Sequence, residues 1–481
     1  MNDSSALWRS QFVIGADLPD LSDRGLVRYS LGSLDLWCSP SLQPTTSGAV
    51  TVLGNAASLT SSDLPEHFAA THGGMDPTDI AELGLDLVGR YVLLAALDSG
   101  PIILPDVLAS RRVFLSEDGL IASSSERLLA DIGATPRTRS AADRAILDHP
   151  GLVAREFATF GLHSAFSGYR HLLANRVANL RTGRIDVCSP ATQPQSGSLP
   201  EAARTLRSVT RALHQLGEVE LGLTGGFDSR VLLAGFAAEG LAVDTFTFVD
   251  GREKKSVDAT VAAQLAAVVG VRHEEVPEPE PDPSISAMLE ATQPVVRSLP
   301  HVLSQLTWLS RRAQHRVTIN GVGGEISRPR YGACPRRLPL WAARRIIVGH
   351  QPAAHDLDAF DAWWADRYAT AAGDTHLDFP SVHYWEQRIP IWGALFVAEK
   401  DLFADEVPGF CCGRLQKQLI VFPARERSSV LGSSIFIQLI EELSPELARL
   451  EPPPPVPRKQ FAYDLTPVPR FARTLRRGWG T

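Results

Sequence analysis

Residues 221–230 read Leu-Gly-Leu-Thr-Gly-Gly-Phe-Asp-Ser-Arg, a short apolar run that opens into a glycine-rich loop. The pattern predicts a buried strand over residues 219–223 and a helix from Val231 onward, so residues 224–229 form the turn between them. Backbone amides in such a turn converge on one point, and the helix N-terminus adds partial positive charge there. The stretch therefore predicts a nucleotide-phosphate site, with a plain strand-to-helix turn as the alternative.

The side chains of this turn indicate how phosphate would be held. Gly225 and Gly226 let the backbone approach an anion without a clashing Cβ. Asp228 is poorly suited to touching phosphate directly and well suited to holding Mg²⁺ against it. The turn lacks the Gly-Lys-Ser/Thr of a Walker A motif, and it is not a Gly-x-Gly-x-x-Gly sequence. It resembles instead the Ser-Gly-Gly-x-Asp-Ser pyrophosphate loop of the ATP pyrophosphatases, with Thr224 in place of the first serine.

Helix and strand patterns alternate after the turn. The periodicity predicts strands over residues 244–249, 271–276 and 317–320, and helices over residues 258–270 and 301–316. A second glycine-rich turn, Gly-Val-Gly-Gly-Glu at residues 321–325, follows the last of these strands. Such alternation predicts an α/β fold with a mostly parallel sheet, helices on both faces, and ligands at the carboxyl ends of the strands. Both glycine turns lie at such ends.

The order of these motifs resembles the synthetase domain of the asparagine synthetase family. The matching motifs are Thr-Gly-Gly-Phe-Asp-Ser, a helix with Asp-x-x-x-Ala-x-x-x-Ala followed by Gly-x-x-His273, and Asn-Gly-Val-Gly-Gly-Glu. In that family the second turn supplies an acidic residue, usually Asp, that binds the Mg²⁺ on pyrophosphate together with the loop Asp. The resemblance therefore implies ATP and Mg²⁺ as cofactors, and Asp228 and Glu325 as catalytic metal ligands. A glutamate favoured by a helix dipole is the plainer explanation of Glu325.

The resemblance implies further contacts to the nucleotide, with adenosine lying along the strand at residues 244–249. Arg230 replaces the small residue usual after Asp-Ser, which points to a phosphate or substrate specific to this branch. A catalytic lysine near the C-terminus also contacts the phosphates in this family; Lys459 resembles it loosely, and Lys400 and Lys417 are alternatives. The implied nucleotide-binding residues are Leu223, Thr224, Gly225, Gly226, Phe227, Asp228, Ser229, Phe248, Gly323 and Gly324.

The N-terminal half carries a different pattern. Residues 89–98, 105–115 and 119–129 predict strands of an antiparallel layer. They look similar to strands of the family's glutaminase domain, whose nucleophile is a cysteine directly after the initiator Met. Position 2 is Asn2, and an amide does not easily replace a thiolate in this chemistry. We therefore expect a glutaminase-like antiparallel α+β sandwich that hydrolyses no glutamine.

An inactive glutaminase restricts where the amine comes from. It must be free ammonia, as in an ammonia-dependent asparagine synthetase-like enzyme, or an amine of the substrate. Beta-lactam synthetases and lasso-peptide cyclases, which belong to the same family, adenylate a carboxylate and let an amine of the same molecule attack it. The resemblance thus implies an AMP-forming amide synthetase acting on a small-molecule or peptide carboxylate and amine, with room for a partner protein that delivers a peptide. Metal and backbone donors would stabilise the departing pyrophosphate.

Composition agrees with this interpretation. The chain has 481 residues, of which 44% are hydrophobic, and this length is sufficient for two domains. Its net charge of -7 gives no general attraction to nucleic acid. We expect no membrane association and a cytoplasmic protein, because no apolar run reaches membrane length and no signal-peptide pattern begins the chain. The five cysteines lack metal-ligand spacing and predict reduced thiols, and the histidines show no zinc motif.

Breaks in composition predict the domain boundaries. A Pro-, Ser- and Gly-rich linker covers residues 189–200, and a proline run over residues 451–457 predicts extended polyproline. Residues 380–450 read as a helical lobe rich in aromatic residues. The predicted units are a glutaminase-like domain over residues 1–190, an ATP-binding domain with parallel sheet and helical lobe over residues 200–460, and a basic C-terminal tail over residues 461–481.

Two other classes of protein fit parts of the pattern. A pyrophosphatase-loop enzyme that adenylates an RNA base would need a basic surface or sulfur-relay cysteines, which the sequence does not show. A non-catalytic nucleotide-binding scaffold or partner subunit is suggested by Asn2 and by Glu325 in place of Asp. The intact Gly-Gly-Phe-Asp-Ser turn favours the enzyme.

Overall fold

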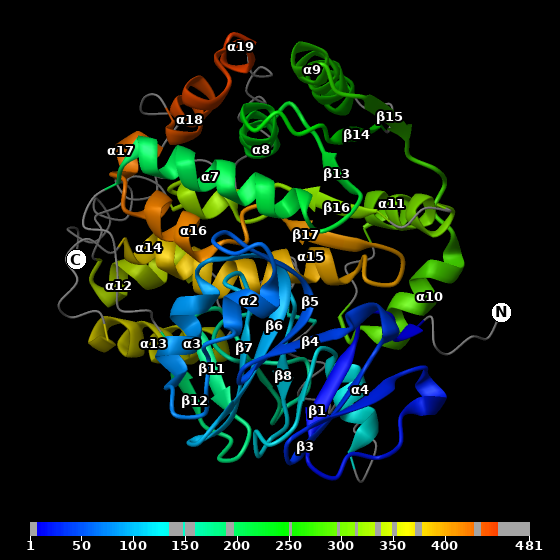
Figure 1. Cartoon of the computed structure of the whole chain (residues 1–481), viewed down its shortest axis with the longest axis vertical. Coiled ribbons are helices and arrows are strands. Elements are labelled where there is room, and N and C mark those ends of the chain that lie inside the picture. The colour runs from blue at the N-terminus through cyan, green and yellow to red at the C-terminus, as the bar shows by residue number, and fades with distance from the viewer. Residues whose placement is uncertain are drawn as a thin grey trace.

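A computed structural model describes most of the chain, and we divide it into an N-terminal part, residues 7–188, and a C-terminal part, residues 197–450. The residues it describes are 7–133, 148–149, 159–188, 197–249, 253–295, 299–312, 316–331, 338–348, 354–370, 378–427 and 434–450. Lys459, the proline run and the predicted basic tail lie outside them. In Figure 1 the N-terminal strands, coloured blue to cyan, occupy the lower half, and the parallel sheet with its helices occupies the upper half.

Two antiparallel six-stranded sheets form the N-terminal part. The first has the order β10-β8-β9-β1-β3-β2 and the second the order β12-β11-β7-β6-β5-β4. The first sheet consists of β1 (Phe12–Gly15), β2 (Val27–Leu31), β3 (Leu34–Cys38), β8 (Phe114–Leu115), β9 (Ala122–Ser123) and β10 (Arg170–His171). The second consists of β4 (Pro44–Ser47), β5 (Val50–Ser58), β6 (Leu87–Leu97), β7 (Gly100–Pro105), β11 (Arg176–Asn179) and β12 (Ile185–Val187).

Apolar side chains join the two sheets face to face. Phe12 and Ile14 of β1 belong to one buried cluster with Leu53 and Val92 of the second sheet. Because side chains alternate along a strand, the next residues of β5 and β6 face the other way, where two helices cover them. The short helices of this part are η1 (Ser22–Arg24), η2 (Pro40–Leu42), α2 (Leu64–Phe68), α3 (Pro77–Gly84) and α4 (Glu126–Ile132). The N-terminal part is therefore a sandwich with an outer helical layer.

The C-terminal part contains a five-stranded sheet in which every pairing is parallel. Its order is β15-β14-β13-β16-β17, and Leu221 of β13 lies opposite Thr245 and Ile319 of the two neighbouring strands. The strands are β13 (Val219–Gly222), β14 (Asp244–Val249), β15 (His273–Pro277), β16 (Val317–Asn320) and β17 (Asp405–Pro408). The carboxyl ends of all five strands therefore lie at one edge of the sheet.

Helices cover both faces of this sheet. On one face, Leu206, Leu232 and Leu265 from three helices pack with Leu221 of the central strand in the largest apolar cluster. On the other, Trp308 stacks on Phe246 of β14 with ring centroids 5.6 Å apart. The helices are α7 (Leu199–His214), α8 (Phe227–Ala238), α9 (Glu253–Val269), α10 (Pro283–Thr292), α11 (Pro300–Ser310), α18 (Ile435–Leu443) and α19 (Pro445–Ala448).

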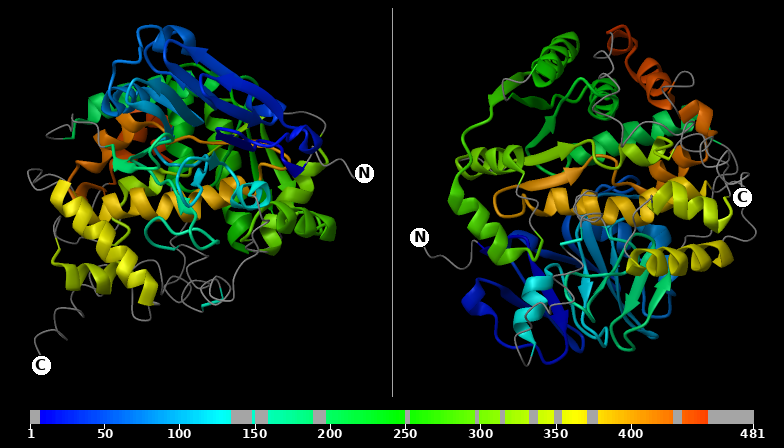
Figure 2. Two further views of the ribbon diagram at one scale, coloured as in Figure 1. Left: turned by 90° about the horizontal axis from the view of Figure 1, so that it is seen from below. Right: turned by 180° about the vertical axis from the view of Figure 1, so that it is seen from behind.

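A lobe of helices stands between the sheet and the sandwich. Its core gathers tryptophan and tyrosine side chains, among them Trp363, Trp364, Tyr384 and Trp385. Figure 2 shows these helices, yellow to orange, beside the N-terminal strands. They are η3 (Gly324–Ser327), α12 (Leu340–Ala343), η4 (Arg344–Val348), α13 (Ala354–Thr370), α14 (Phe379–His383), η5 (Tyr384–Gly393), α15 (Ala394–Ala398), α16 (Gly413–Ile420) and α17 (Ala424–Arg427).

The α/β class, with antiparallel sheets before a parallel sheet, is confirmed, whereas some elements differ from prediction. The strand predicted over residues 119–129 is wrong beyond Ser123, because Ser125 accepts a hydrogen bond from the N–H of Leu128 and starts helix α4. The helix predicted over residues 301–316 ends at Ser310. Strand β17 interrupts the predicted helical lobe. None of the helices within the described ranges has the length and apolarity to cross a membrane.

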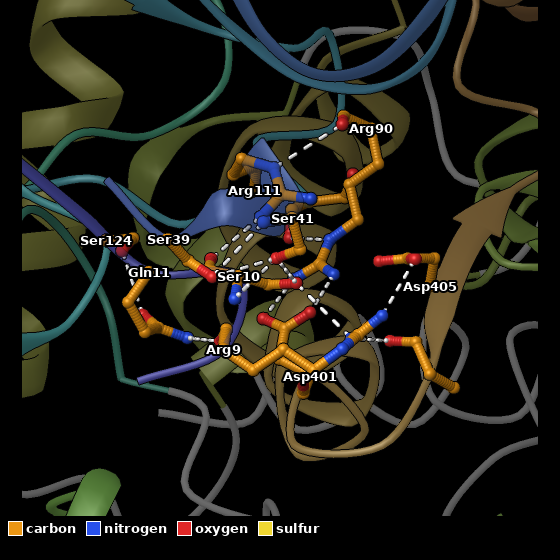
Figure 3. Close-up of polar contacts among 12 residues, drawn as sticks. Arg9, Ser10, Gln11, Ser39, Ser41, Arg90, Arg111, Ser124, Asp401 and Asp405 are labelled. Atoms are coloured by element: carbon orange, nitrogen blue, oxygen red, sulfur yellow. Dashed lines mark hydrogen bonds and ion pairs between the residues drawn. The ribbon is translucent and has the colours of Figure 1, made fainter. Parts of the chain in front are cut away.

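Two ion pairs, one of them buried, link the N-terminal and C-terminal parts, and Figure 3 shows them. Arg90 of β6 forms a two-pronged pair with Asp401, and their side chains are 2% and 6% exposed. Arg9 donates to the carbonyl oxygen of Asp401 and pairs with Asp405 of β17 at 2.8 Å. Arg111 donates to the carbonyl oxygen of Ser10. We call these residues the junction, and they tie the start of β17 to the sandwich.

Candidate functional site

The first glycine turn, residues 224–229, follows β13 and includes the first residues of α8, which begins earlier than the predicted start at Val231. Helix α8 begins at Phe227, so Asp228 and Ser229 lie in its first turn, and Gly226 is its N-cap residue. No side chain of the described residues caps this end of the helix. The backbone N–H groups there have no partner within a helix, and a negatively charged ligand would satisfy them.

Hydrogen bonds hold the first turn in a closed loop. The hydroxyl of Ser229 accepts from the N–H of Thr224 at 3.0 Å, and the hydroxyl of Thr224 accepts from the N–H of Gly226 at 3.2 Å. Leu223 is fully buried and donates its N–H to Phe246 of the neighbouring strand. The turn is thus fixed by its own side chains at one end and by the sheet at the other.

Arg230 forms a hydrogen bond with the backbone of the first turn. Its guanidinium is buried and donates to the carbonyl oxygens of Gly225 and Leu450, at 3.3 and 2.8 Å. The same group lies 5.7 Å from the centre of the Phe227 ring. These contacts occupy Arg230 with the protein itself, and they connect the turn to the last residue that the structure describes.

The second glycine turn, residues 321–325, packs directly against Asp228. A Cβ at Gly321 would lie 2.8 Å from Cβ of Asp228, and a Cβ at Gly324 would lie 2.6 Å from its Oδ1. Gly323 has φ +95°, a backbone conformation that favours glycine. The glycines therefore allow the turns that follow β13 and β16 to touch, which brings the two predicted carboxylates to one place.

Asp228 lies among charged groups of the second turn. Burial is the main cause that raises its pKa from the ordinary value to about 6; Glu325 acts in the same direction, and Arg328 and Arg330 oppose the shift. Its Oδ2 pairs with the guanidinium of Arg328 at 2.5 Å. The charge of Glu325 therefore disfavours the ionised form of Asp228, as expected for a nearby carboxylate.

Asp228 and Glu325 are suited to hold a Mg²⁺ ion that binds together with a phosphate. Oδ1 of Asp228 is buried with no hydrogen-bond partner in the described structure, and Glu325 accepts one hydrogen bond, from the N–H of Gly323 at 3.0 Å. The described residues contain no group of three or more His, Cys, Asp or Glu side chains arranged for a metal. Two carboxylates with further oxygens from substrate phosphates are a common way for proteins to hold Mg²⁺.

Further polar atoms around the second turn are buried without a hydrogen-bond partner among the described residues. They are Nδ2 of Asn320, Nε of Arg328 and Oε1 of Gln416. Two of these side chains form hydrogen bonds with the turn. Oδ1 of Asn320 accepts from the N–H of Val322, and Nε2 of Gln416 donates to the carbonyl oxygen of Gly323 at 3.0 Å. Buried polar groups are nearly always satisfied in proteins, so their concentration here indicates a binding region.

The strand expected to lie along adenosine, β14, ends beside the first turn. Phe248 is half-buried, and its ring meets Trp308 and Phe246 edge to face, at 5.2 and 5.5 Å. The three rings form an aromatic wall at the carboxyl end of the sheet.

The predicted lysines lie elsewhere or outside the described residues. The ammonium of Lys400 is 2.7 Å from Oε1 of Glu406 and 3.9 Å from the centre of the Phe396 ring. Burial lowers the pKa of Lys417 to about 8, and the charges that act on it are those of Glu82 and Arg414. Lys459 is not described, so its role stays a prediction.

Sequence reasoning missed the arginines of the site. Arg328 pairs with Asp228, and Arg330 lies 5.5 Å from the centre of the Tyr384 ring. Burial raises the pKa of Tyr384 to about 12 and lowers that of His383 to about 3, so both groups are uncharged near neutral pH. The signal in the sequence is Arg-Pro-Arg at residues 328–330, directly after the second turn.

The family's second glutamine-binding signature, an Asn-Gly-Glu turn before Tyr-Asn, is missing from the sequence, which reads His72-Gly-Gly-Met-Asp-Pro in roughly that region. Asn2 lies outside the described residues. In the segment that begins at His72, Asp76 and Asp79 form a capping box that starts α3. These carboxylates accept hydrogen bonds from backbone N–H groups, so they have a structural role at the helix end.

Comparisons with known proteins give no family for this chain. No protein-family model matches the sequence, and a search of curated proteins finds no match either.

Proposed function

We propose that this protein is an ATP-dependent, AMP-forming amide synthetase that adenylates a carboxylate and transfers the acyl group to an amine. The observation that carries the proposal is the contact between the two glycine turns. They place Asp228 and the second turn side by side at the N-terminus of α8, where the sheet ends. Such an arrangement suits a polyphosphate held by backbone donors on one side and by a cation between carboxylates on the other.

The reaction has two steps. An oxygen of the substrate carboxylate attacks the α-phosphorus of ATP, and the bond to the pyrophosphate oxygen breaks, which gives acyl-AMP and pyrophosphate. The amine then attacks the acyl carbon, loses a proton, and expels AMP, which leaves the amide. The uncapped N–H groups at the start of α8 and the guanidinium of Arg328 would bind the negative charge that collects on pyrophosphate. Mg²⁺, held by Asp228 and Glu325 when bound, would add positive charge at the same place.

The neighbouring helical lobe offers a place for the substrate. Arg330, Tyr331 and Tyr384 adjoin the second turn, and the hydroxyl of Tyr331 lies 3.0 Å from Nδ1 of His383. An arginine beside aromatic rings suits a carboxylate attached to an apolar group. The amine would come from the substrate or from free ammonia.

Analysis of the nucleotide products tests the proposal. The full chain would be incubated with Mg-ATP, ammonium or glutamine, and a small-molecule and peptide extract of the source cells. We expect AMP and pyrophosphate, no advantage of glutamine over ammonium, and no products from Asp228→Ala. Asp35→Ala, which removes a carboxylate from β3, is the matched control and should keep full activity.

Other products would contradict the proposal. ADP as the product would exclude the adenylation step. A folded protein that binds no Mg-ATP would exclude nucleotide chemistry at these turns.

A further inference from the structure

Asp228 already has a cationic partner in the protein itself. The guanidinium of Arg328 binds Oδ2 at 2.5 Å, and the two side chains are 29% and 22% exposed. The second oxygen, Oδ1, is buried and has no partner in the part of the chain that the structure describes. One oxygen of the carboxylate expected to hold a metal ion is thus paired with a positive charge, and the other has no partner among the described residues.

The backbone keeps Arg328 close to this carboxylate. Arg328 directly follows η3, and its N–H donates to the carbonyl oxygen of Glu325 at 3.1 Å. The residue therefore belongs to the same turn as Glu325, and only its side chain is free to change direction. Because a guanidinium does not lose its proton at physiological pH, it is a permanent positive charge at the site.

We propose that Arg328 is a resident counter-ion, which keeps a bare divalent cation off Asp228 and turns to the polyphosphate when nucleotide and cation arrive together. This inference rests on the proposed function for the identity of the polyphosphate. It assigns Arg328 a positioning role in the empty site and a binding role in the loaded one.

The chemistry of the three groups supports this exchange. A cation alone would have to break a charge-assisted hydrogen bond and then lie beside a guanidinium that has no anion to bind. A triphosphate changes this balance, since its oxygens can accept the donors that Arg328 withdraws from Asp228. Nε of Arg328 has no hydrogen-bond partner among the described residues and is a further donor for such a contact.

Arg330 has a different environment, although it lies only two residues further along. It is placed over the Tyr384 ring, with its guanidinium carbon 5.5 Å from the ring centre. The charge of Arg330 acts on Asp228 more weakly than that of Arg328, because Arg328 contacts the carboxylate directly. The exchange is therefore assigned to Arg328.

Binding of Mn²⁺ without nucleotide tests the proposal. Free Mn²⁺ would be measured by electron paramagnetic resonance at pH 8 in titrations of the full-length wild type and of Arg328→Gln. We expect the variant to bind Mn²⁺ at least about tenfold more tightly, which corresponds to about 1.4 kcal/mol. Binding of ATP in the presence of Mg²⁺, measured by calorimetry, should change in the opposite direction, by a loss of similar size.

Two further variants serve as controls. Arg328→Lys keeps the positive charge and should stay close to the wild type in Mn²⁺ binding. Arg328→Met also removes the charge and takes the place of Arg328→Gln if that variant does not fold. Arg344→Gln removes an arginine that pairs with Asp361 in the helical lobe, and it should change neither measurement. Thermal unfolding would establish that each variant is folded.

Two outcomes can be told apart. If Arg328→Gln and the wild type bind Mn²⁺ equally, the counter-ion role is overturned, even where the wild type binds Mg-ATP normally. If the wild type binds no nucleotide, the proposed function fails, while the Mn²⁺ comparison still decides whether Arg328 protects Asp228.

Discussion

Replacing Asp401 by Asn should destabilise the protein strongly, because it breaks the most buried ion pair of the junction. Asp401 contacts both terminal nitrogens of Arg90, one of them at 2.9 Å, and Nε of Arg90 donates to the carbonyl oxygen of Ser110. The two charged side chains are 2% and 6% exposed, so water cannot replace the lost partner. An asparagine also presents its amide donors to a guanidinium that only donates.

The size of the effect follows from this geometry. Breaking a buried pair by removing one partner typically costs about 3 to 5 kcal/mol, since an uncompensated charge stays inside. Replacing both partners with apolar residues of similar volume is often neutral by comparison. We therefore expect Asp401→Asn to lower the free energy of unfolding by about 3 kcal/mol or more, and the double variant Arg90→Met with Asp401→Leu to recover most of that loss.

Urea unfolding followed by circular dichroism measures the change. Asp35→Asn is a matched control, because Arg28 and Asp35 form a similar two-pronged pair in which the arginine side chain is 57% exposed. Such a pair is worth less than about 1 kcal/mol. If Asp401→Asn costs no more than this control, the reasoning from burial is refuted.

Three further predictions concern the site and the cysteines. Gly324→Ala would place a Cβ 2.6 Å from Oδ1 of Asp228, so we expect calorimetry to show weaker Mg-ATP binding. In Gly222→Ala the nearest described atom to the added Cβ would be 3.6 Å away, so this variant should bind Mg-ATP normally; equal affinities of the two variants would contradict the prediction. Because the pKa of Asp228 is raised to about 6 in the folded protein, its ionised form opposes folding above that pH, and the penalty disappears as the pH falls toward 4. Asp228→Asn should therefore melt at a higher temperature than the wild type at pH 7.5 and at the same temperature at pH 4; a lower melting temperature at pH 7.5 would count against this. The four described cysteines are buried, so a Cys334→Ala variant should react with a thiol reagent only on unfolding, and rapid labelling of the native variant would show otherwise.

The strands next to the glycine turns are the most predictable part of the fold. The predicted ranges 244–249 and 317–320 coincide with β14 and β16, and β13 ends one residue earlier than expected. These strands are short segments in which apolar and polar residues alternate, and each ends at a turn signal, so pattern and boundary agree. The glycine turns also indicated that Asp228 and Glu325 would lie near each other, because parallel strands end at one edge of the sheet.

Strand β17 shows what local pattern does not reveal. Its sequence, Asp-Glu-Val-Pro, begins with two carboxylates and has no alternating run. Asp405 pairs with Arg9 and Glu406 with Lys400, and the parallel pairing with β16 completes the strand. Arg9 and β16 are distant from β17 in the sequence, so local spacing does not show these partners.

The charge balance of the site was hidden for the same reason. Arg328 and Asp228 are 100 positions apart, and no motif that we used includes an arginine after the second turn. The resemblance directed attention to carboxylates and lysines, whereas the structure surrounds Asp228 with guanidinium groups. Folding alone brings these charges together.

The position of β17 limits which fragments of the protein can be produced on their own. It is an edge strand of the parallel sheet. Cys411 lies shortly after β17, and its carbonyl oxygen accepts a hydrogen bond from the N–H of Gly89 in β6. Val88 and Cys412 continue this contact as an antiparallel bridge. A recombinant fragment that starts at Gly197 would lose this cover and expose unpaired backbone groups, a known route to self-association. We therefore expect a fragment that carries the two glycine turns to be produced without self-association only when the sandwich is part of the same polypeptide.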